Sequence, residues 1–467
     1  MNNPHLTSTN FAALLQKTLA CSRYAKRTLE ADQCLLDWLQ ENYATPCERA
    51  EMLALLQQSG LDLNDEAGLA RAVRRLRKQV MVKLILRDLN GLCGLDEVMR
   101  AMTGLAEVCV QLAQSCLMQT LQQQFGAPIG EAGATPQQLL IIGMGKLGGG
   151  ELNVSSDIDL IFIYPEDGET NGARTLGNHE FFTRLGRRLI SLINEATADG
   201  YVFRVDMRLR PYGDSGPLVM SFAALEEYLV SQGREWERYA WIKARVIAPL
   251  YDPQTGELMQ LVQPFIFRKY LDFGAIDSMR KLHAQIRQEV QRRDRLNNIK
   301  LGPGGIREIE FTAQVFQLIR GGQDAGLRIR PTQQVLQALA GNGQIDAQTA
   351  AGLDAAYIFL RNLEHRLQYL DDQQTQELPE SDDDRAIIAN GMGYADYAAL
   401  LHELDRHRAL VRRQFEQIFG AQQDDQGDTQ LWHDGITADE LAENVGTISY
   451  EIFCAVSARV PRVYLPA

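Results

Sequence analysis

Only eight residues, 149–156, separate a glycine turn ending at Gly148 from the carboxylates Asp157 and Asp159. The turn, GMGKLG, satisfies the G-x-G-x-x-G pattern of a dinucleotide-binding loop. A dinucleotide fold needs a crossover of about a dozen residues or more between its first two strands, and eight residues rich in glycine, asparagine and serine are too few. Lys146 is followed by leucine rather than by Ser or Thr, which excludes a P-loop. The glycine pattern is therefore interpreted as a chance match.

The two carboxylates fit a different chemistry. Asp157 and Asp159 begin the apolar run 157–164, which is predicted to be a buried strand. Residues two apart on a strand leave the same face, with Cα atoms roughly 6.6 Å apart. Such a pair can share divalent ions, as two-metal phosphoryl transfer requires. Carboxylate oxygens are the hard ligands that Mg²⁺ prefers, so the pair predicts a magnesium site.

A third carboxylate lies in the segment YVFRVDMRLR, residues 201–210, where polar and apolar residues alternate. The alternation predicts a strand with its polar groups on one face. Asp206 shares that face with Arg204, Arg208 and Arg210 and is the candidate third metal ligand. Beside a phosphate site, these arginines favour nucleotide or phosphate contact over simple pairing with surface acids.

The glycine turn is the candidate phosphate cradle. Gly148 and Gly149 carry no side chain, so their amides are open to close approach by phosphate oxygens. Lys146 is either a phosphate contact or a lysine at the exposed end of the preceding strand, and the sequence favours neither. An isolated D-x-D pair is usually structural. The turn upstream and the later in-strand aspartate favour a catalytic interpretation, and together these features follow the pattern of a nucleotidyltransferase fold.

Composition limits the partners and the compartment. A formal net charge of -13 lacks the basic footprint that binding a polyanion requires, so nucleic acid is not expected as the main substrate. The seven cysteines form no C-x-x-C pair, which favours reduced thiols in the cytoplasm over disulfides or structural zinc. No run of about 18 uncharged apolar residues and no secretion signal are found, so no contact with a membrane is expected.

A chain of 467 residues is too long for one ordinary core. The fold class is predicted to be α+β, with a small mixed sheet flanked by helices. In the later helical part, KLGPGGIREIEF precedes a helix; Glu308 is interpreted as compensating the helix N-terminus, while the role of Glu310 stays open. The expected regions are a helical N-terminal region (1–130), a nucleotidyltransferase-like catalytic domain (131–275), a helical bundle (276–422), and a linker with a disordered or truncated tail (423–467).

Four segments within residues 139–320 together resemble one family: GMGKLGGGELNVSSDIDLIF, YVFRVDMRLRPYGDSGPLV, GREWERYAWIKAR and IKLGPGGIREIEF. They are similar to the glutamine synthetase adenylyltransferase/adenylyl-removing enzymes, which carry two nucleotidyltransferase domains. The resemblance implies that the first domain removes AMP from a tyrosine of glutamine synthetase by phosphorolysis and that the second attaches it. The helical leader and the GGGELN segment indicate the first copy. The residues after Glu443 do not resemble the family's continuation, so we expect truncation or a frame shift and loss of the AMP-attaching activity.

The resemblance also implies roles and partners. Asp157, Asp159 and Asp206 would bind the metal ions, and Gly148, Gly149 and Ser156 would contact phosphate. The implied partners are glutamine synthetase, the signalling protein PII, phosphate and ADP or ATP. Two alternatives remain open: an enzyme of the same fold that attaches AMP, and a non-catalytic regulatory fragment that binds PII or glutamine synthetase.

Overall fold

The computed structural model describes residues 8–131, 135–268 and 297–419. The tail predicted over 423–467 lies outside these residues. The described chain begins with helices only, because apolar residues recur at helical spacing throughout this part. These helices are α1 (Ser8–Cys21), α2 (Arg23–Ala31), α3 (Gln33–Asn42), α4 (Arg49–Gln58), α5 (Glu66–Leu89) and α6 (Leu95–Phe125).

A five-stranded mixed sheet follows, with the strand order β5-β3-β2-β7 and β6 paired with β3. Strands β2 and β3 are antiparallel, whereas β5 and β6 run parallel to β3. The glycine turn between β2 and β3 therefore joins antiparallel neighbours, which confirms that it is not the crossover of a dinucleotide fold. The strands are β2 (Leu140–Gly143), β3 (Ile158–Tyr164), β5 (Val205–Asp206), β6 (Val219–Ser221) and β7 (Arg245–Ala248); β1 (Pro128–Gly130) and β4 (Gly168–Thr170) form a separate pair.

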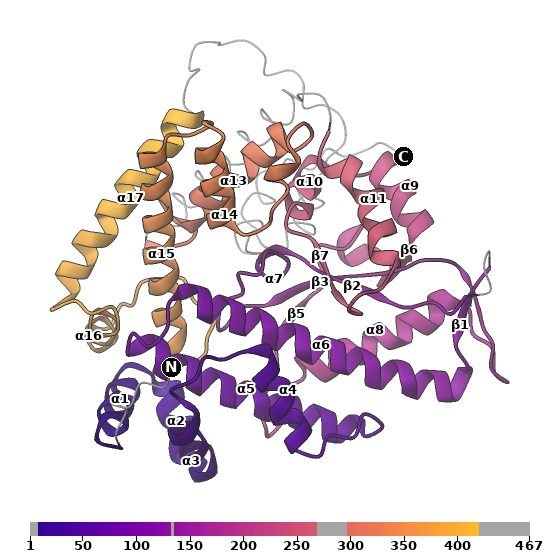
Figure 1. Ribbon diagram of the computed structural model, residues 1–467, viewed down its shortest axis with the longest axis horizontal. Helices are drawn as coiled ribbons and strands as arrows, with labels where there is room; N and C mark the ends of the chain where they lie inside the picture. Colours follow the sequence, from indigo (N-terminus) through magenta and orange to yellow (C-terminus); the bar gives the residue numbers. More distant parts are fainter. Residues whose placement is uncertain (1–7, 132–134, 269–296, 420–467) are drawn as a thin grey trace, which may run out of the picture.

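Helices cover both faces of this sheet. Leu160 and Phe162 of β3 pack into one core with α6 and α8 (Asn178–Asn194). The helical periodicity of residues 178–196 predicts α8, and the structure confirms it. Ile161 and Ile163 point the other way and pack with the group α9 (Phe222–Ser231), α10 (Glu235–Trp241) and α11 (Gln254–Ile266). Figure 1 shows α6 on one side of the sheet and α9 and α11 on the other. Alternate residues of β3 thus serve two cores, which explains its uninterrupted apolar sequence.

Within the described residues, α6 is the one helix long and apolar enough to cross a membrane by length and composition. Its apolar window is 72% buried inside the protein. The helix packs against α5, α8 and β7, so its apolar surface is covered by protein.

The last described region is a helical bundle with its own apolar core. The bundle helix α15 also contacts α2 and α6, so the bundle packs against the N-terminal helices (Figure 1). The bundle helices are α13 (Ile306–Arg320), α14 (Thr332–Gly341), α15 (Ala347–Tyr369), α16 (Asp382–Gly391) and α17 (Tyr397–Phe419).

Two local predictions are wrong. The strand expected over 201–210 is reduced to Val205–Asp206, because the chain turns directly afterwards and the Arg210 N–H donates to the carbonyl of Met207 (3.2 Å). The helical periodicity of residues 221–250 predicts helix throughout this stretch. The helices end at Trp241, however, and β7 follows. In the first segment the Arg210 side chain folds onto its own backbone, and in the second β7 pairs with the distant strand β2. In both places these contacts outweigh local periodicity.

Candidate functional site

The structure brings the three predicted carboxylates together where β3 and β5 run side by side. Asp159 and Asp206 are register partners of these parallel strands, so their side chains leave the same face of the sheet. Asp157 lies one residue before β3, next to the Ile158 amide that donates to the Arg204 carbonyl (2.9 Å). The carboxylate positions are therefore fixed by backbone pairing.

Asp159 is the most deeply placed of the three, with 6% of its surface exposed. Burial raises the pKa of its carboxyl well above the usual range, and the charges of Asp206 and then Asp157 raise it further. Lys300 and Arg208 act in the opposite direction. Carboxylates gathered in a poorly solvated place are costly without a cation beside them.

The other two carboxylates are engaged by arginines. Arg204 donates from Nε to Asp157 Oδ1 at 2.6 Å, and its Nη2 donates to the Ser155 carbonyl at 2.8 Å. Arg208 folds back on Asp206, with Nε 3.0 Å from each carboxylate oxygen and Nη2 2.5 Å from Oδ2. The predicted arginine neighbours are therefore present at Asp157 and Asp206.

These ion pairs affect how the three aspartates could bind a metal ion. The donor set suits Mg²⁺, because it consists of carboxylate oxygens and concentrates negative charge. In the ranges that the structure describes, however, no three His, Cys, Asp or Glu side chains converge so as to hold one ion. Asp157 and Asp206 point to Arg204 and Arg208, so joint ligation with Asp159 requires these two pairs to open.

Arg210 takes no part in this arrangement. Its Nη1 donates to the Met207 carbonyl (2.8 Å) and to Asp214 Oδ1 (3.2 Å), and its Nη2 donates to the Asp214 carbonyl (3.0 Å). The structure thus gives Arg210 the role of fixing its own turn, unlike Arg204 and Arg208.

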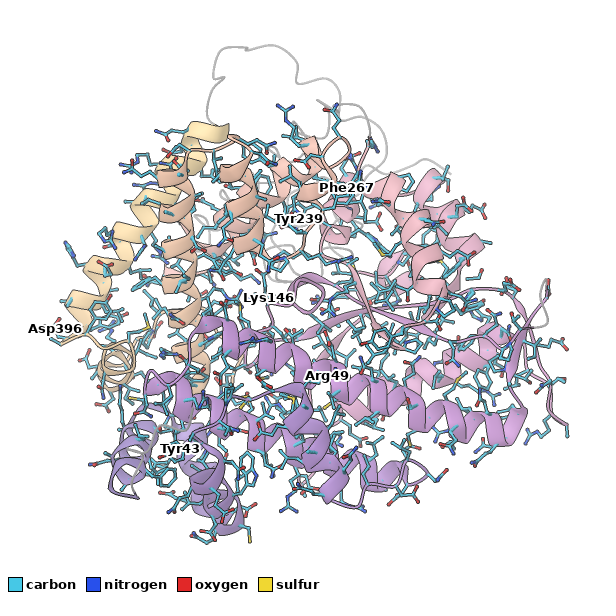
Figure 2. The ribbon with its side chains drawn as sticks, viewed as in Figure 1. Tyr43, Arg49, Lys146, Tyr239, Phe267 and Asp396 are labelled. Atoms are coloured by element: carbon cyan, nitrogen blue, oxygen red, sulfur yellow. The ribbon has the colours of Figure 1, made fainter. Side chains whose placement is uncertain are left out.

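Lys146 lies in the short helix α7 (Gly145–Gly149), and it does not sit at an exposed strand end. Its side chain is 13% exposed and projects toward the bundle (Figure 2), where Nζ lies 3.0 and 3.1 Å from the two carboxylate oxygens of Glu364. Burial lowers the pKa of Lys146 to about 7, against the opposing effect of Glu364. Lys146 is therefore a poorly solvated amine between the glycine turn and the bundle.

The glycines of α7 differ in what they permit. A Cβ on Gly148 would lie 2.0 Å from the Lys243 carbonyl oxygen and 2.3 Å from that of Gly143, so no larger residue fits there. The Gly148 N–H donates to the Met144 carbonyl at 3.0 Å, so this amide is already used within the protein. At Gly149 the nearest atom to an added Cβ is a Glu151 carboxylate oxygen, 3.0 Å away. Close packing therefore requires Gly148, whatever it contacts in a substrate.

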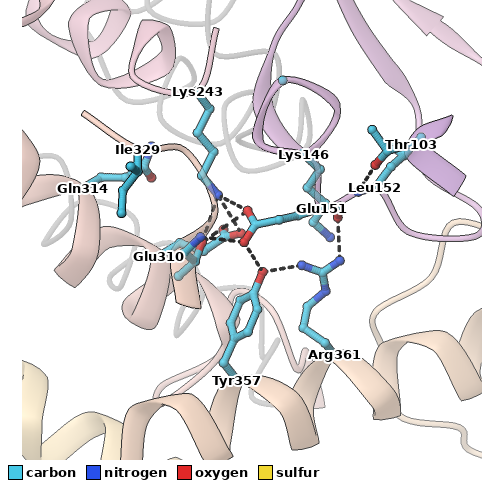
Figure 3. Close-up of polar contacts among 12 residues, drawn as sticks. Thr103, Lys146, Glu151, Leu152, Lys243, Glu310, Gln314, Ile329, Tyr357 and Arg361 are labelled. Carbon is cyan, nitrogen blue, oxygen red and sulfur yellow. Dashed lines mark hydrogen bonds and ion pairs between the residues drawn. The ribbon is translucent and has the colours of Figure 1, made fainter. Parts of the chain in front are cut away.

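Nothing in the sequence pointed to a second charged cluster beside the turn. Glu151, Lys243, Glu310 and Arg361 meet between the five-stranded sheet and the bundle (Figure 3). The role of Glu310 is now defined, because its carboxylate lies 3.7 Å from Lys243 Nζ. Glu308, in the first turn of α13, accepts the Gly304 N–H at 3.0 Å, as expected for a residue that compensates the helix start.

Known families match along most of the chain. Residues 12–260 match the family model described as glutamate-ammonia ligase adenylyltransferase. Residues 280–419 match one described as GlnD PII-uridylyltransferase, and residues 419–464 match one described as alanine racemase, C-terminal domain.

Curated relatives share the name bifunctional glutamine synthetase adenylyltransferase/adenylyl-removing enzyme. The protein of Nitrosomonas eutropha is 56% identical over 421 residues, covering 90% of this chain and 45% of the relative. That of Chromobacterium violaceum is 56% identical over 431 residues, covering 91% and 47%. That of Ralstonia nicotianae is 49% identical over 468 residues, covering 95% and 49%. The chain thus spans about half the length of the curated relatives that it matches.

Proposed function

This chain belongs to the glutamate-ammonia ligase adenylyltransferase family, and on that premise we propose that it removes AMP from an adenylylated tyrosine of glutamine synthetase by metal-dependent phosphorolysis. The observation that carries the proposal is the pairing of Asp159 with Asp206, with Asp157 one residue before the same strand. Removal is preferred to attachment because the GGGELN segment and the helical leader resemble the first of the family's two catalytic domains.

In the proposed reaction, an oxygen of inorganic phosphate attacks the adenylyl phosphorus in line. The bond from phosphorus to the tyrosine oxygen breaks, so that ADP forms and the tyrosine oxygen leaves and takes up a proton. Mg²⁺ bound by Asp157, Asp159 and Asp206 would supply charge stabilisation at the transferring group.

The chain's own residues would bind and orient the phosphates. Arg204 and Arg208 lie beside the carboxylates, and their guanidinium groups are proposed to bind phosphate oxygens when a cation takes over the acidic partners. Lys146, Gly149 and Ser156 are proposed as further contacts on the turn, whereas Gly148 is left out because its N–H donates to the Met144 carbonyl. Arg210 is left out, because both of its terminal nitrogens donate within its own loop.

Glutamine synthetase as the protein substrate, PII as a partner and a cytoplasmic location are part of the same proposal. The relatives' printed name supports the first of these. The second catalytic activity named there, attachment of AMP, is the alternative for this chain, because a D-x-D site alone does not set the direction of the reaction.

The test is to incubate the chain with adenylylated glutamine synthetase, Mg²⁺ and phosphate, and to measure ADP. We expect ADP in proportion to deadenylylated enzyme. Asp157→Asn is expected to lower the rate by about two orders of magnitude, whereas Asp199→Asn, in an exposed turn, serves as control. AMP attachment from ATP without phosphorolysis would select the alternative, and an unchanged rate in Asp157→Asn would show that the site is misassigned.

A further inference from the structure

One face of α15 is polar although it is fully buried. Its five members lie within an arc of about 100° on the helix, and each has 0% of its surface exposed: Tyr357, Arg361, Glu364, His365 and Gln368. A polar stripe of this kind is costly unless each group has a partner. Each of the five residues contacts one segment of the catalytic domain, residues 146–155, which links the glycine turn to the D-x-D pair. Among the described residues, Arg361 Nε, His365 Nδ1 and Gln368 Nε2 have no hydrogen-bond partner.

The first two members bind the chain just after the glycines. The Tyr357 hydroxyl donates to Glu151 Oε1 at 3.2 Å, and Arg361 Nη2 donates to the Glu151 carbonyl at 2.6 Å (Figure 3). Arg361 Nη2 also donates to Asn153 Oδ1, and its Nη1 donates to the Tyr357 hydroxyl. Tyr357 and Arg361 therefore hold both the side chain and the backbone of Glu151.

The other three members bind the segment on either side of Glu151. Glu364 accepts from Lys146 within the glycine turn, as described above. His365 Nε2 lies 3.3 Å from Asn153 Oδ1. Gln368 Oε1 accepts the Ser155 N–H at 3.1 Å. Contacts thus extend along the segment up to two residues before Asp157.

Glu151 also fixes the segment to α14 of the bundle and to the turn between α10 and β7. Its carboxylate accepts from Lys243 Nζ at 2.6 Å and from the Thr332 N–H, at the start of α14, at 2.7 Å. Such a network contributes little net stability compared with an apolar contact of the same size, but it specifies one geometry, because any displacement leaves a buried charge unpaired.

The far end of the segment leads into the carboxylate site. Ser155 receives the Gln368 contact through its N–H, and its carbonyl accepts from Arg204, the same side chain that binds Asp157. A continuous chain of contacts therefore runs from α15 through residues 146–155 to the residue that precedes β3.

We infer that α15 positions the glycine turn and the D-x-D pair for transfer of the adenylyl group, with Tyr357 and Arg361 as positioning residues; this inference rests on the proposed function. Neither residue is placed in contact with a substrate. They act through Glu151 and through the backbone that carries the phosphate contacts.

The chain offers a matched pair of variants. Tyr357 and Tyr369 both lie on α15 and are fully buried, and each hydroxyl donates to a carboxylate: Tyr357 to Glu151, and Tyr369 to Asp88 in α5 at 2.7 Å. Tyr357→Phe and Tyr369→Phe remove the same group from the same helix. Only the first change touches the segment 146–155.

Three measurements on the whole chain test the inference: kcat and KM for phosphate in phosphorolysis, binding of Mg²⁺–ADP by calorimetry, and amide hydrogen exchange over residues 146–157. In Tyr357→Phe we expect kcat to fall about tenfold, since small misplacements of reacting groups are costly, with faster exchange over 146–157. In Tyr369→Phe, kcat and the exchange rates over 146–157 stay at wild-type values. Arg361→Lys is expected to retain less than half of the wild-type kcat, because the lysine ammonium cannot make the parallel hydrogen bonds that the guanidinium makes.

If the wild-type chain turns over and the two tyrosine variants have equal kcat and equal exchange over 146–157, the inference is wrong while the proposed function stands. If the wild-type chain binds Mg²⁺–ADP without phosphorolysis, the proposed reaction is wrong. In that case a selective loss of binding and faster exchange in Tyr357→Phe still supports the positioning role, and their absence overturns it.

Discussion

Arg366 on α15 binds Asp88 on α5 through both terminal nitrogens, although 278 residues separate them in the sequence. The Tyr369 hydroxyl donates to the same carboxylate. Asp88 is 6% exposed, so the pair is one of the polar joints between the bundle and the N-terminal helices.

Asp88→Asn is expected to lower the free energy of unfolding by about 3–5 kcal/mol at pH 7, because Arg366 then keeps a buried charge without a carboxylate. Burial raises the pKa of Asp88, but the Arg366 and Tyr369 contacts outweigh it, and the net pKa is lowered. The wild-type advantage is therefore present above the unfolded pKa of about 3.9 and is lost as the pH falls through the lower folded value. Urea unfolding of the wild-type chain and of Asp88→Asn at pH 7 and pH 3 measures this difference in the free energy of unfolding. An equal deficit of the variant at both pH values would contradict it.

Gly148→Ala is expected to destabilise the chain by about 3 kcal/mol or more, since the added Cβ would lie 2.0 Å from a backbone oxygen that cannot move aside. Gly104→Ala in α6 is the matched control. No atom lies within 4 Å of its added Cβ, so the change should stabilise the helix by about 0.5–1 kcal/mol. The melting temperatures of the two variants should move in opposite directions, and a similar shift in both would show that the packing around Gly148 is looser than described.

Arg204→Lys is expected to raise the KM for phosphate about tenfold, because lysine cannot bind a carboxylate or phosphate through two parallel donors. Arg187→Lys, on the exposed side of α8, should leave the KM unchanged. Steady-state phosphorolysis at varied phosphate measures both. If the Arg204 variant keeps the wild-type KM, this guanidinium serves only to pair with Asp157.

The pKa of Lys146, lowered to about 7 chiefly by burial, predicts a pH dependence of phosphate binding. Its ammonium is present below that pH and is lost above it, so attraction for an anion weakens as the pH rises from 6 to 8. Lys146→Arg keeps its charge throughout this range, since arginine titrates above pH 12. The ratio of the two KM values for phosphate cancels the ionisation of phosphate itself. That ratio should change across pH 7, and a constant ratio would show that Lys146 does not contact phosphate.

Local pattern was enough to predict the strand that carries Asp159 and the helix α8, because each has a strong apolar periodicity that tertiary contacts reinforce. It misjudged the segment around Asp206. There the alternation of polar and apolar residues is genuine, yet Arg208 bonds to the side chain two residues earlier and the chain turns. Of the alternating apolar residues only Phe203 and Leu209 are buried, while Val205 and Met207 are half-buried like the polar residues beside them. A pattern of period two does not record whether the backbone continues straight.

The charged network around Glu151 could not be predicted for a different reason. Glu151 follows α7 and Lys243 follows α10, whereas Glu310 and Arg361 lie in the bundle helices α13 and α15. Each looks like an ordinary surface charge in its own stretch of sequence. The sequence alone leaves the role of Glu310 open, because it does not share a helix face with Glu308. Its charged neighbour is Lys243, 67 positions away in sequence. Such pairings depend on how helices far apart in the chain are placed, which periodicity does not encode.

The contacts of α15 have a practical consequence for dissecting this protein. A fragment cut at the sequence boundaries 131 and 275 would lack both the long apolar helix α6 that covers one side of its sheet and the helix α15, which pairs Glu364 with Lys146 and hydrogen-bonds to Glu151. Such a fragment would expose to water the apolar side chains that α6 covers and would leave Lys146 without its carboxylate partner, so we do not expect it to fold by itself. The catalytic sheet is completed by chain segments on both sides of it.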